Sequence, residues 1–167
     1  GAAAGRASQS AGGEIWLGVM QDFGWEAPEG VETVDDAVRV EVEDGSGIIA
    51  GANPRSVLLA VYRLLYEAGC RWVRPGADGE VIPKRALGGL QARFAESASF
   101  RHRAICIEGA TSLENVLELI EWMPKVGFSG YFMQFREGFT FFDRWQRHQN
   151  NPLLQPEAFT VEQARQF

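Results

Sequence analysis

Apolar and polar residues alternate strictly over residues 37–43, which read AVRVEVE. Successive side chains of a strand point to opposite faces, so this pattern predicts a half-buried β-strand. Asp44-Gly45 then supplies a tight turn, because glycine adopts the positive φ that short hairpin turns require. Residues 47–51 (GIIAG) return along the first strand, which completes a predicted β-hairpin. Its core-facing side chains are expected to be Val38, Val40 and Val42.

A helical pattern follows the hairpin. Asn53 can accept hydrogen bonds from the free amides of a first turn, and Pro54 suits the first helical position. Gly69 is expected to follow the helix in a left-handed conformation. The residues expected to face the core are Val57, Leu58, Val61, Leu65 and Ala68, with Leu64 alongside.

Shorter extended segments complete this part of the chain. They are expected at residues 14–20, 70–76, 80–83 and 91–96. The Asp35-Asp36 pair is interpreted as loop charge and not as a metal site. We expect a disordered tail over residues 1–13, rich in small residues, and a first domain over residues 14–98.

The pattern changes after Phe100. Ala104–Ile107 is a short, continuously apolar segment, as expected for a buried strand of a parallel sheet. Thr111-Ser112-Leu113-Glu114 forms a capping box that predicts a helix, and Gly127 should follow its end. Gly130–Phe135 predicts a second strand, so the segment is expected to form one βαβ unit. The helix residues expected to face inward are Leu113, Val116, Leu117, Ile120 and Met123; Thr160 could cap a further helix.

Composition excludes several function classes. The chain has 167 residues, a net charge of -6 and a sequence pI near 5.0, which argues against nucleic acid as a partner. No apolar run reaches the roughly 20 residues of a membrane helix, and no signal peptide is recognised, so a soluble protein of unknown localisation is expected. Cys70 and Cys106 are expected to be buried free thiols, and no Cys or His spacing suits a metal site.

Residues 47–83 carry a recognisable combination of motifs. The segment resembles the non-catalytic N-terminal domain of family 20 β-hexosaminidases and family 67 α-glucuronidases, in which a hairpin and a helix precede a Gly-Cys-Arg-Trp segment and a Pro-Gly turn. The matching positions are Gly51, Arg55, Tyr62, Leu65, Gly69, Arg71, Trp72, Pro75 and Gly76.

Residues 100–110 (FRHRAICIEGA) are similar to the first barrel strand of the hexosaminidase catalytic domain. Arg103 matches the arginine that grips sugar hydroxyls in that family, and Glu108 stands where the family usually has Asp. Two departures indicate a divergent or separate family: Ala104 replaces a glycine, and residues 134–152 do not match the second strand.

The resemblance implies a fold and a function. The expected fold is α+β: an accessory domain with a mixed sheet and one long helix, then the first βαβ of an incomplete TIM (β/α)₈ barrel over residues 99–167. The chain would be a fragment of a glycoside hydrolase acting on oligosaccharides or glycoconjugates, without the catalytic acid and nucleophile. The alternatives are a non-catalytic carbohydrate-binding or assembly module and a fold in which the last 65 residues pack as helices without any barrel.

Six residues are candidates for sugar contacts. Glu108, Gln134 and Arg136 lie at the carboxyl ends of predicted strands, which is where TIM-barrel sites lie. The alternative for Glu108 is a helix cap or an ion pair with Arg136. Arg103 can bind vicinal hydroxyls with two donors, but it precedes its strand, so a salt bridge at the opposite end is equally open. The full set is Arg103, Glu108, Gln134, Arg136, Trp145 and His148.

No catalytic residue, metal or cofactor is expected within the chain. The expected partner is a carbohydrate, not nucleic acid or membrane. Self-association through the incomplete barrel is a further expectation, because Ile105, Ile107, Phe132 and Phe135 would otherwise lack cover.

Overall fold

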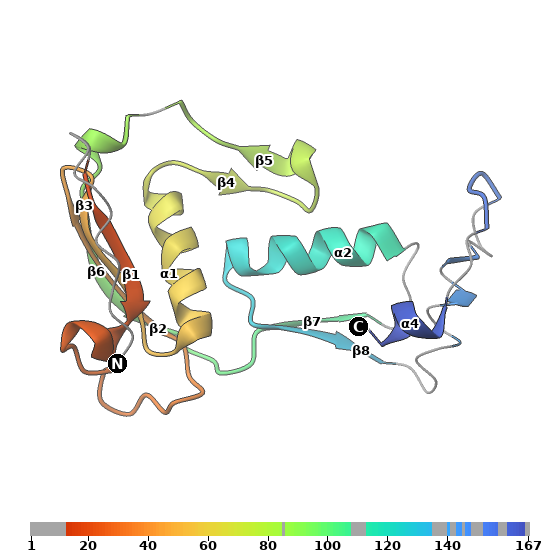
Figure 1. Cartoon of the computed structure of the whole chain (residues 1–167), viewed down its shortest axis with the longest axis horizontal. Coiled ribbons are helices and arrows are strands. Elements are labelled where there is room, and N and C mark those ends of the chain that lie inside the picture. The colour runs from red at the N-terminus through yellow and green to blue at the C-terminus, as the bar shows by residue number, and fades with distance from the viewer. Residues whose placement is uncertain are drawn as a thin grey trace. The chain divides into compact units, whose positions relative to one another are not determined.

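The computed structural model divides the chain into two compact α+β units (Figure 1). The first contains described residues within 1–70 and 82–101, and the second contains those within 71–81 and 102–167. The mixed sheet of the first unit confirms the predicted α+β class. The structure describes residues 13–84, 86–107, 113–134, 140, 143–144, 146–147, 152–156 and 160–165.

A four-stranded mixed sheet of order β1-β3-β2-β6 forms the first unit. Strand β3 lies parallel to β1 and antiparallel to β2, and β2 also pairs antiparallel with β6. The predicted hairpin is confirmed: Asp44 and Gly45 have φ values of 49° and 73°, as in the type I′ turn that matches strand twist. The strand bounds are β1 Ile15–Val19, β2 Ala37–Glu43, β3 Ser46–Gly51 and β6 Ala92–Ser97.

Helix α1 (Pro54–Glu67) follows the hairpin as predicted. The Asn53 side chain accepts a hydrogen bond of 3.0 Å from the Ser56 amide, which caps the helix, and Pro54 occupies its first turn. Gly69 has a φ of 99°, and its amide donates to the Tyr66 carbonyl. These local signals set both ends of the helix.

The predicted inward face of α1 was wrong by part of a turn. Leu58 is 47% exposed, whereas Ser56 and Ala60 are fully buried. A Cβ on Gly51 would lie only 2.3 Å from the Val57 nitrogen, so the helix approaches the sheet where the sheet lacks a side chain. Small residues therefore occupy the contact and larger ones lie at its sides. The buried helix positions are Ser56, Leu59, Ala60 and Leu64.

Both faces of the sheet are partly covered. The α1 face holds the main apolar core, in which the predicted valines are all buried. A smaller cluster around Met20, Ala37 and Ala50 covers part of the opposite face, with Trp25 packed against it. The main core consists of Val38, Val40, Val42, Ile49, Leu59, Ala60, Leu64, Ala68 and Leu90.

The Asp35-Asp36 pair is more than the loop charge that we predicted. Asp36 is 3% exposed and accepts hydrogen bonds from the Ser56 hydroxyl at 2.8 Å and the Arg55 Nε at 3.0 Å. Hydrogen bonding from Arg101 holds the pKa of Asp35 below its ordinary value. The pair with Arg101 therefore stabilises the fold above that ordinary pKa, and the stabilisation is lost as the pH falls through the lowered value.

The second unit contains the predicted βαβ. Strands β7 (Ala104–Ile107) and β8 (Gly130–Met133) pair in parallel, with Ala104 opposite Gly130 and Ile107 opposite Met133. Helix α2 (Leu113–Trp122) lies between them in the chain. Thr111 and Ser112 of the predicted capping box lie outside the described residues, while Gly127 follows the helical segment with a φ of 88°.

A short antiparallel pair, β4 (Arg71–Trp72) and β5 (Glu80–Val81), belongs to the same unit. The Trp122 Nε1 donates a 2.8 Å hydrogen bond to the Trp72 carbonyl. The Lys125 ammonium lies 2.6 Å from the Glu80 carboxylate. These two contacts join the β4–β5 pair to the C-terminal end of α2.

The βαβ residues are less buried than we predicted. Ala104 and Cys106 are exposed, and Phe132 is 56% exposed. On α2, Val116 is buried as expected, but Leu117 and Ile120 are exposed, and Met123 is buried just beyond the helix. The reason is that two strands and one helix cover only one face of each element, whereas a parallel strand is normally covered on both. Neither cysteine forms a disulfide within the described residues, and the prediction that Cys106 is buried is wrong.

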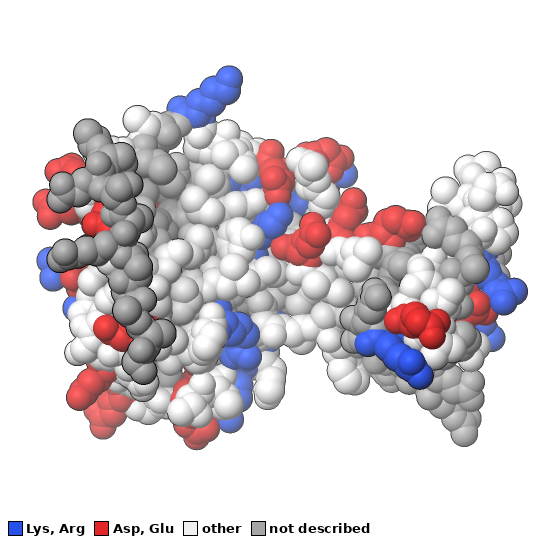
Figure 2. Space-filling view, viewed as in Figure 1, with Lys and Arg blue, Asp and Glu red and all other residues white. Residues whose placement is uncertain are grey.

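The remaining described elements are short. Thr160 caps α4 (Val161–Ala164) as predicted, by accepting a 3.2 Å hydrogen bond from the Gln163 amide. Within the described residues, no helix is long and apolar enough to cross a membrane. Acidic and basic side chains are interspersed over the face seen in Figure 2. In the described part of the chain, 3₁₀ helices cover Met20–Phe23, Ala77–Gly79, Leu87–Gly89 and Met123–Val126.

Candidate functional site

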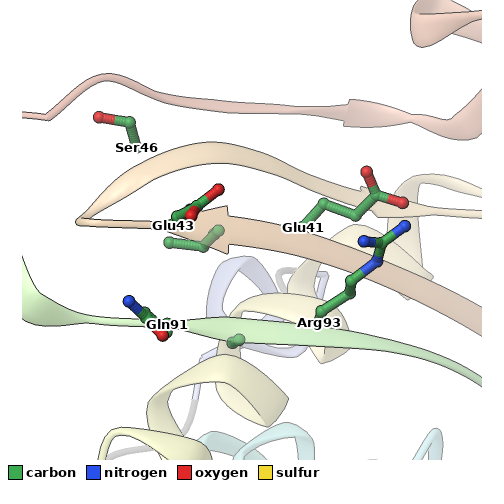
Figure 3. Close-up of a pocket in the computed structure, with 7 residues that line it drawn as sticks. Glu41, Glu43, Ser46, Gln91 and Arg93 are labelled. Carbon is green, nitrogen blue, oxygen red and sulfur yellow. The ribbon is translucent and has the colours of Figure 1, made fainter.

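An open groove lies on the face of the first sheet that points away from α1 (Figure 3). It has a volume of about 630 Å³ and crosses strands β2 and β6 near the hairpin turn. Most of the residues that line it are polar, and they include donors, acceptors and both signs of charge. They are Glu41, Val42, Glu43, Ser46, Gln91, Ala92 and Arg93.

Strand alternation and register bring these side chains together. The core valines of β2 face α1, so Glu41 and Glu43 face the groove. The pairing places Glu41 opposite Arg93 on β6 and Glu43 opposite Ser46 on β3. Figure 3 shows these side chains rising from neighbouring strands on one face of the sheet. The groove is thus a direct product of the hairpin and of the β2–β6 register.

Only some of the charged side chains in the groove have an ion-pair partner among the described residues. The Glu41 carboxylate accepts from Nε and Nη2 of Arg39, at 3.0 and 2.6 Å. The Arg39 guanidinium also stacks 4.0 Å from the Trp25 ring centre, and Arg39 is not among the residues that line the groove. Arg93 makes no ion pair within the described residues. Other arginines of this unit are paired with carboxylates: Arg39, Arg55, Arg63 and Arg101.

The groove was not among the sites predicted from the sequence. Alternation in residues 37–43 indicates that Glu41 and Glu43 face away from the core, which alone is ordinary for a solvated strand. The distinguishing fact is that β6 pairs with β2 and brings Gln91 and Arg93 alongside. Residues 91–96 were predicted only as extended, and their partner strand was not assigned, so the sequence contained no signal for this juxtaposition.

Of the six residues predicted to contact sugar, two lie within the described chain, and the structure separates them. Arg103 directly precedes β7, whereas Gln134 directly follows β8. The strands are parallel, so these residues lie at opposite ends of the pair. The Arg103 Nε donates a 2.8 Å hydrogen bond to the Gly127 carbonyl, and its own carbonyl accepts from the Ser129 amide at 2.7 Å. These hydrogen bonds of Arg103 stabilise the turn that precedes β8.

Gln134 is exposed at the carboxyl end of the parallel pair. Its Oε1 lies 4.0 Å from the Cys106 sulfur, which reaches it from the neighbouring strand. This is the end at which parallel barrels place their active sites. The other four predicted residues, Glu108, Arg136, Trp145 and His148, lie outside the described residues.

A smaller cavity of about 170 Å³ lies in the second unit. It combines the Glu80–Lys125 ion pair with two further carboxylates and the Trp122 ring. The cavity is lined by Gly76, Ala77, Glu80, Glu118, Glu121, Trp122 and Lys125.

No cluster of three or more potential metal ligands occurs among the described residues. Burial raises the pKa of Tyr131 on β8, and its hydroxyl has no hydrogen-bond partner within the described part of the chain.

No protein-family model matches the chain, and no match was found among curated proteins or solved structures.

Proposed function

We propose that the chain contains the accessory domain and the first βαβ of a glycoside hydrolase barrel, of a kind similar to hexosaminidases and α-glucuronidases. The observation that carries this proposal is the parallel pairing of β7 and β8 across helix α2. A (β/α)₈ barrel repeats this unit, and a mixed α+β sheet precedes it here in the order that the sequence resemblance implies.

The exposure pattern of the strands supports the same proposal. Ile105 and Tyr131 are half-buried, whereas Cys106 and Phe132, on the opposite face, are exposed. A barrel strand has helices against one face and side chains of other strands against the other. One covered face and one open apolar face are therefore expected of a βαβ that packs against further strands.

Gln134 lies at the carboxyl end of β8. The proposed sugar contacts are Gln134 together with Glu108 and Arg136, which come after β7 and β8 in the sequence. Arg103 instead stabilises the turn that precedes β8, by a hydrogen bond to the Gly127 carbonyl. Glycoside hydrolysis requires two carboxyl groups, or one acid with a substrate acetamido group, and these families place them on later strands. The chain alone is therefore expected to bind sugar weakly without hydrolysing it.

An NMR titration tests this proposal. Addition of cellohexaose or chitohexaose should shift the amide signals of Cys106 and Gln134, and Gln134→Ala should weaken that response about tenfold, because a side-chain amide provides both a donor and an acceptor to hydroxyls. Chromogenic glycosides should give no turnover. The control is Gln21→Ala, an exposed glutamine in the first unit. Robust turnover, or signals at Cys106 and Gln134 that do not respond to any saccharide, would contradict the proposal.

A second candidate function is assembly through exposed apolar residues of the βαβ. Leu117 and Ile120 on α2 and Phe132 on β8 are all exposed, and apolar surface of this kind favours association. The occupant that we consider is a second copy of the chain, since the same strands could pair in both copies.

Sedimentation velocity distinguishes the second candidate. Self-association should appear as a concentration-dependent increase in mass, and Phe132→Ser should shift the equilibrium toward the monomer, because it removes apolar area from the contact. Val73→Ser is a suitable control, since Val73 is also exposed but lies on neither α2 nor β8. A monomer at every concentration would exclude assembly and leave the glycoside hydrolase proposal unaffected.

A further inference from the structure

The groove on the first sheet has features of a binding site that are separate from the βαβ. Glu43 and Arg93 face it from neighbouring strands, and neither side chain has an ion pair or hydrogen bond within the described residues. Gln91 directly precedes β6 and lies beside Glu43, and its side chain likewise makes no hydrogen bond within the described residues. Among the described residues, the groove thus presents a carboxylate acceptor, a guanidinium donor and an amide that can serve as both.

The charges of the groove balance. The carboxylates Glu41 and Glu43 are offset by Arg39, which is paired with Glu41, and by Arg93, which lies opposite Glu41 on β6. Glu43 and Arg93 are diagonal neighbours across the β2–β6 pair, with backbones about 7–8 Å apart. An anionic ligand would meet the carboxylates, and a cationic ligand would meet Arg93. A neutral ligand with several hydroxyls can donate to Glu43 and accept from Arg93 at the same time, through charge-assisted hydrogen bonds.

An aromatic ring lies on the same face of the sheet. The register aligns Trp16 on β1 with Ile48 on β3, and Ile48 with Glu41, so the three side chains share one row. Trp16 is 40% exposed. An exposed ring provides a flat apolar surface against which the C–H face of a sugar ring can pack. The groove volume of about 630 Å³ is within the roughly 300–1,000 Å³ that is usual for small-molecule sites.

We propose that this groove binds a neutral oligosaccharide, with Glu43, Gln91 and Arg93 bonded to its hydroxyls and Trp16 packed against a ring at the edge of the site. The inference deepens the proposed function, because it gives the first unit its own contact with glycan. The charges of the groove require only a neutral ligand with several hydroxyls. The choice of a glycan among such ligands rests on the proposed function. The site is non-catalytic: it holds the chain on its substrate and requires no residue of the βαβ.

An NMR titration of the full chain tests the groove. Cellohexaose, which is neutral, should shift the amide signals of residues 41–46 and 91–93. Hexagalacturonate and a glucosamine hexamer should bind at least several-fold more weakly, because each introduces one sign of charge. Arg93→Ala should weaken cellohexaose binding about tenfold by removing the charged donor, and Glu43→Gln should weaken it less, since an amide oxygen still accepts.

A matched control distinguishes the groove arginine from an exposed arginine elsewhere in the chain. Arg165→Ala removes an exposed arginine of the second unit and should leave cellohexaose binding unchanged. Unchanged binding by Arg93→Ala, with an intact circular dichroism spectrum, would overturn the groove proposal. So would shifts confined to Cys106 and Gln134, although that result would support the proposed function. Equal binding of all three saccharides would also contradict the charge argument.

Discussion

Gly51→Ala should destabilise the first unit by about 3 kcal/mol or more. A methyl group at this position would lie 2.3 Å from the Val57 nitrogen and 2.4 Å from the Ser56 carbonyl carbon. These are backbone atoms in the first turn of α1, so no side-chain rotation can relieve the clash. The helix would have to move away from β3 and would lose its contact with the core. Urea unfolding followed through the amide signals of residues 37–51 measures the effect on this unit.

Gly88→Ala is the matched control. A Cβ there would have no neighbour within 4 Å, so the same substitution should change the free energy of unfolding by no more than about 0.5 kcal/mol. If the two variants unfold at the same urea concentration, α1 does not lie against β3 as described.

Asp36→Ala should have the second-largest effect, a loss of about 2–3 kcal/mol. The carboxylate joins the start of β2 to the first turn of α1 through the Ser56 hydroxyl and the Arg55 guanidinium. Ser56 is fully buried, so its hydroxyl would lose its partner without gaining water. Arg55 is partly exposed and can be hydrated, so the larger share of the cost should come from Ser56.

A double-mutant cycle checks this division. Ser56→Ala should cost less in the Asp36→Ala background than in the native chain, by about 1 kcal/mol, because the two side chains share one hydrogen bond. Glu29→Ala, at an exposed loop position, should be nearly neutral. Fully additive losses for Asp36 and Ser56 would show that their hydrogen bond does not stabilise the fold.

Local signals in the sequence predicted much of this architecture. The turn at Asp44-Gly45 and the cap at Asn53 depend on a few neighbouring residues, so their chemistry can be recognised directly. The parallel relation of β7 and β8 was predicted from the continuously apolar first strand and from the order strand, helix, strand. The inward face of α1 could not be predicted in the same way. It depends on the absence of a side chain at Gly51 and on the buried carboxylate of Asp36, both distant in sequence from the helix residues that they select.

The candidate sites show the same limit. Gln134 could be placed at the end of its strand by sequence alone, because a strand end is a local property. The position of Arg103 was left open, and the structure places it at the opposite end, bonded to Gly127. The groove could not be predicted, because it depends on which strand lies beside β2. Two outward-facing glutamates have no functional meaning until Arg93 is known to lie opposite one of them.

The parallel pairing of β7 and β8 is the claim on which the proposed function depends most directly. Nuclear Overhauser contacts between backbone protons across the two strands provide the measurement. Parallel pairing predicts that contacts join Ala104 to the region of Gly130 and Ile107 to the region of Met133. Contacts that instead join Ala104 to Met133 and Ile107 to Gly130 would mean that the strands are antiparallel, and the barrel interpretation could not stand.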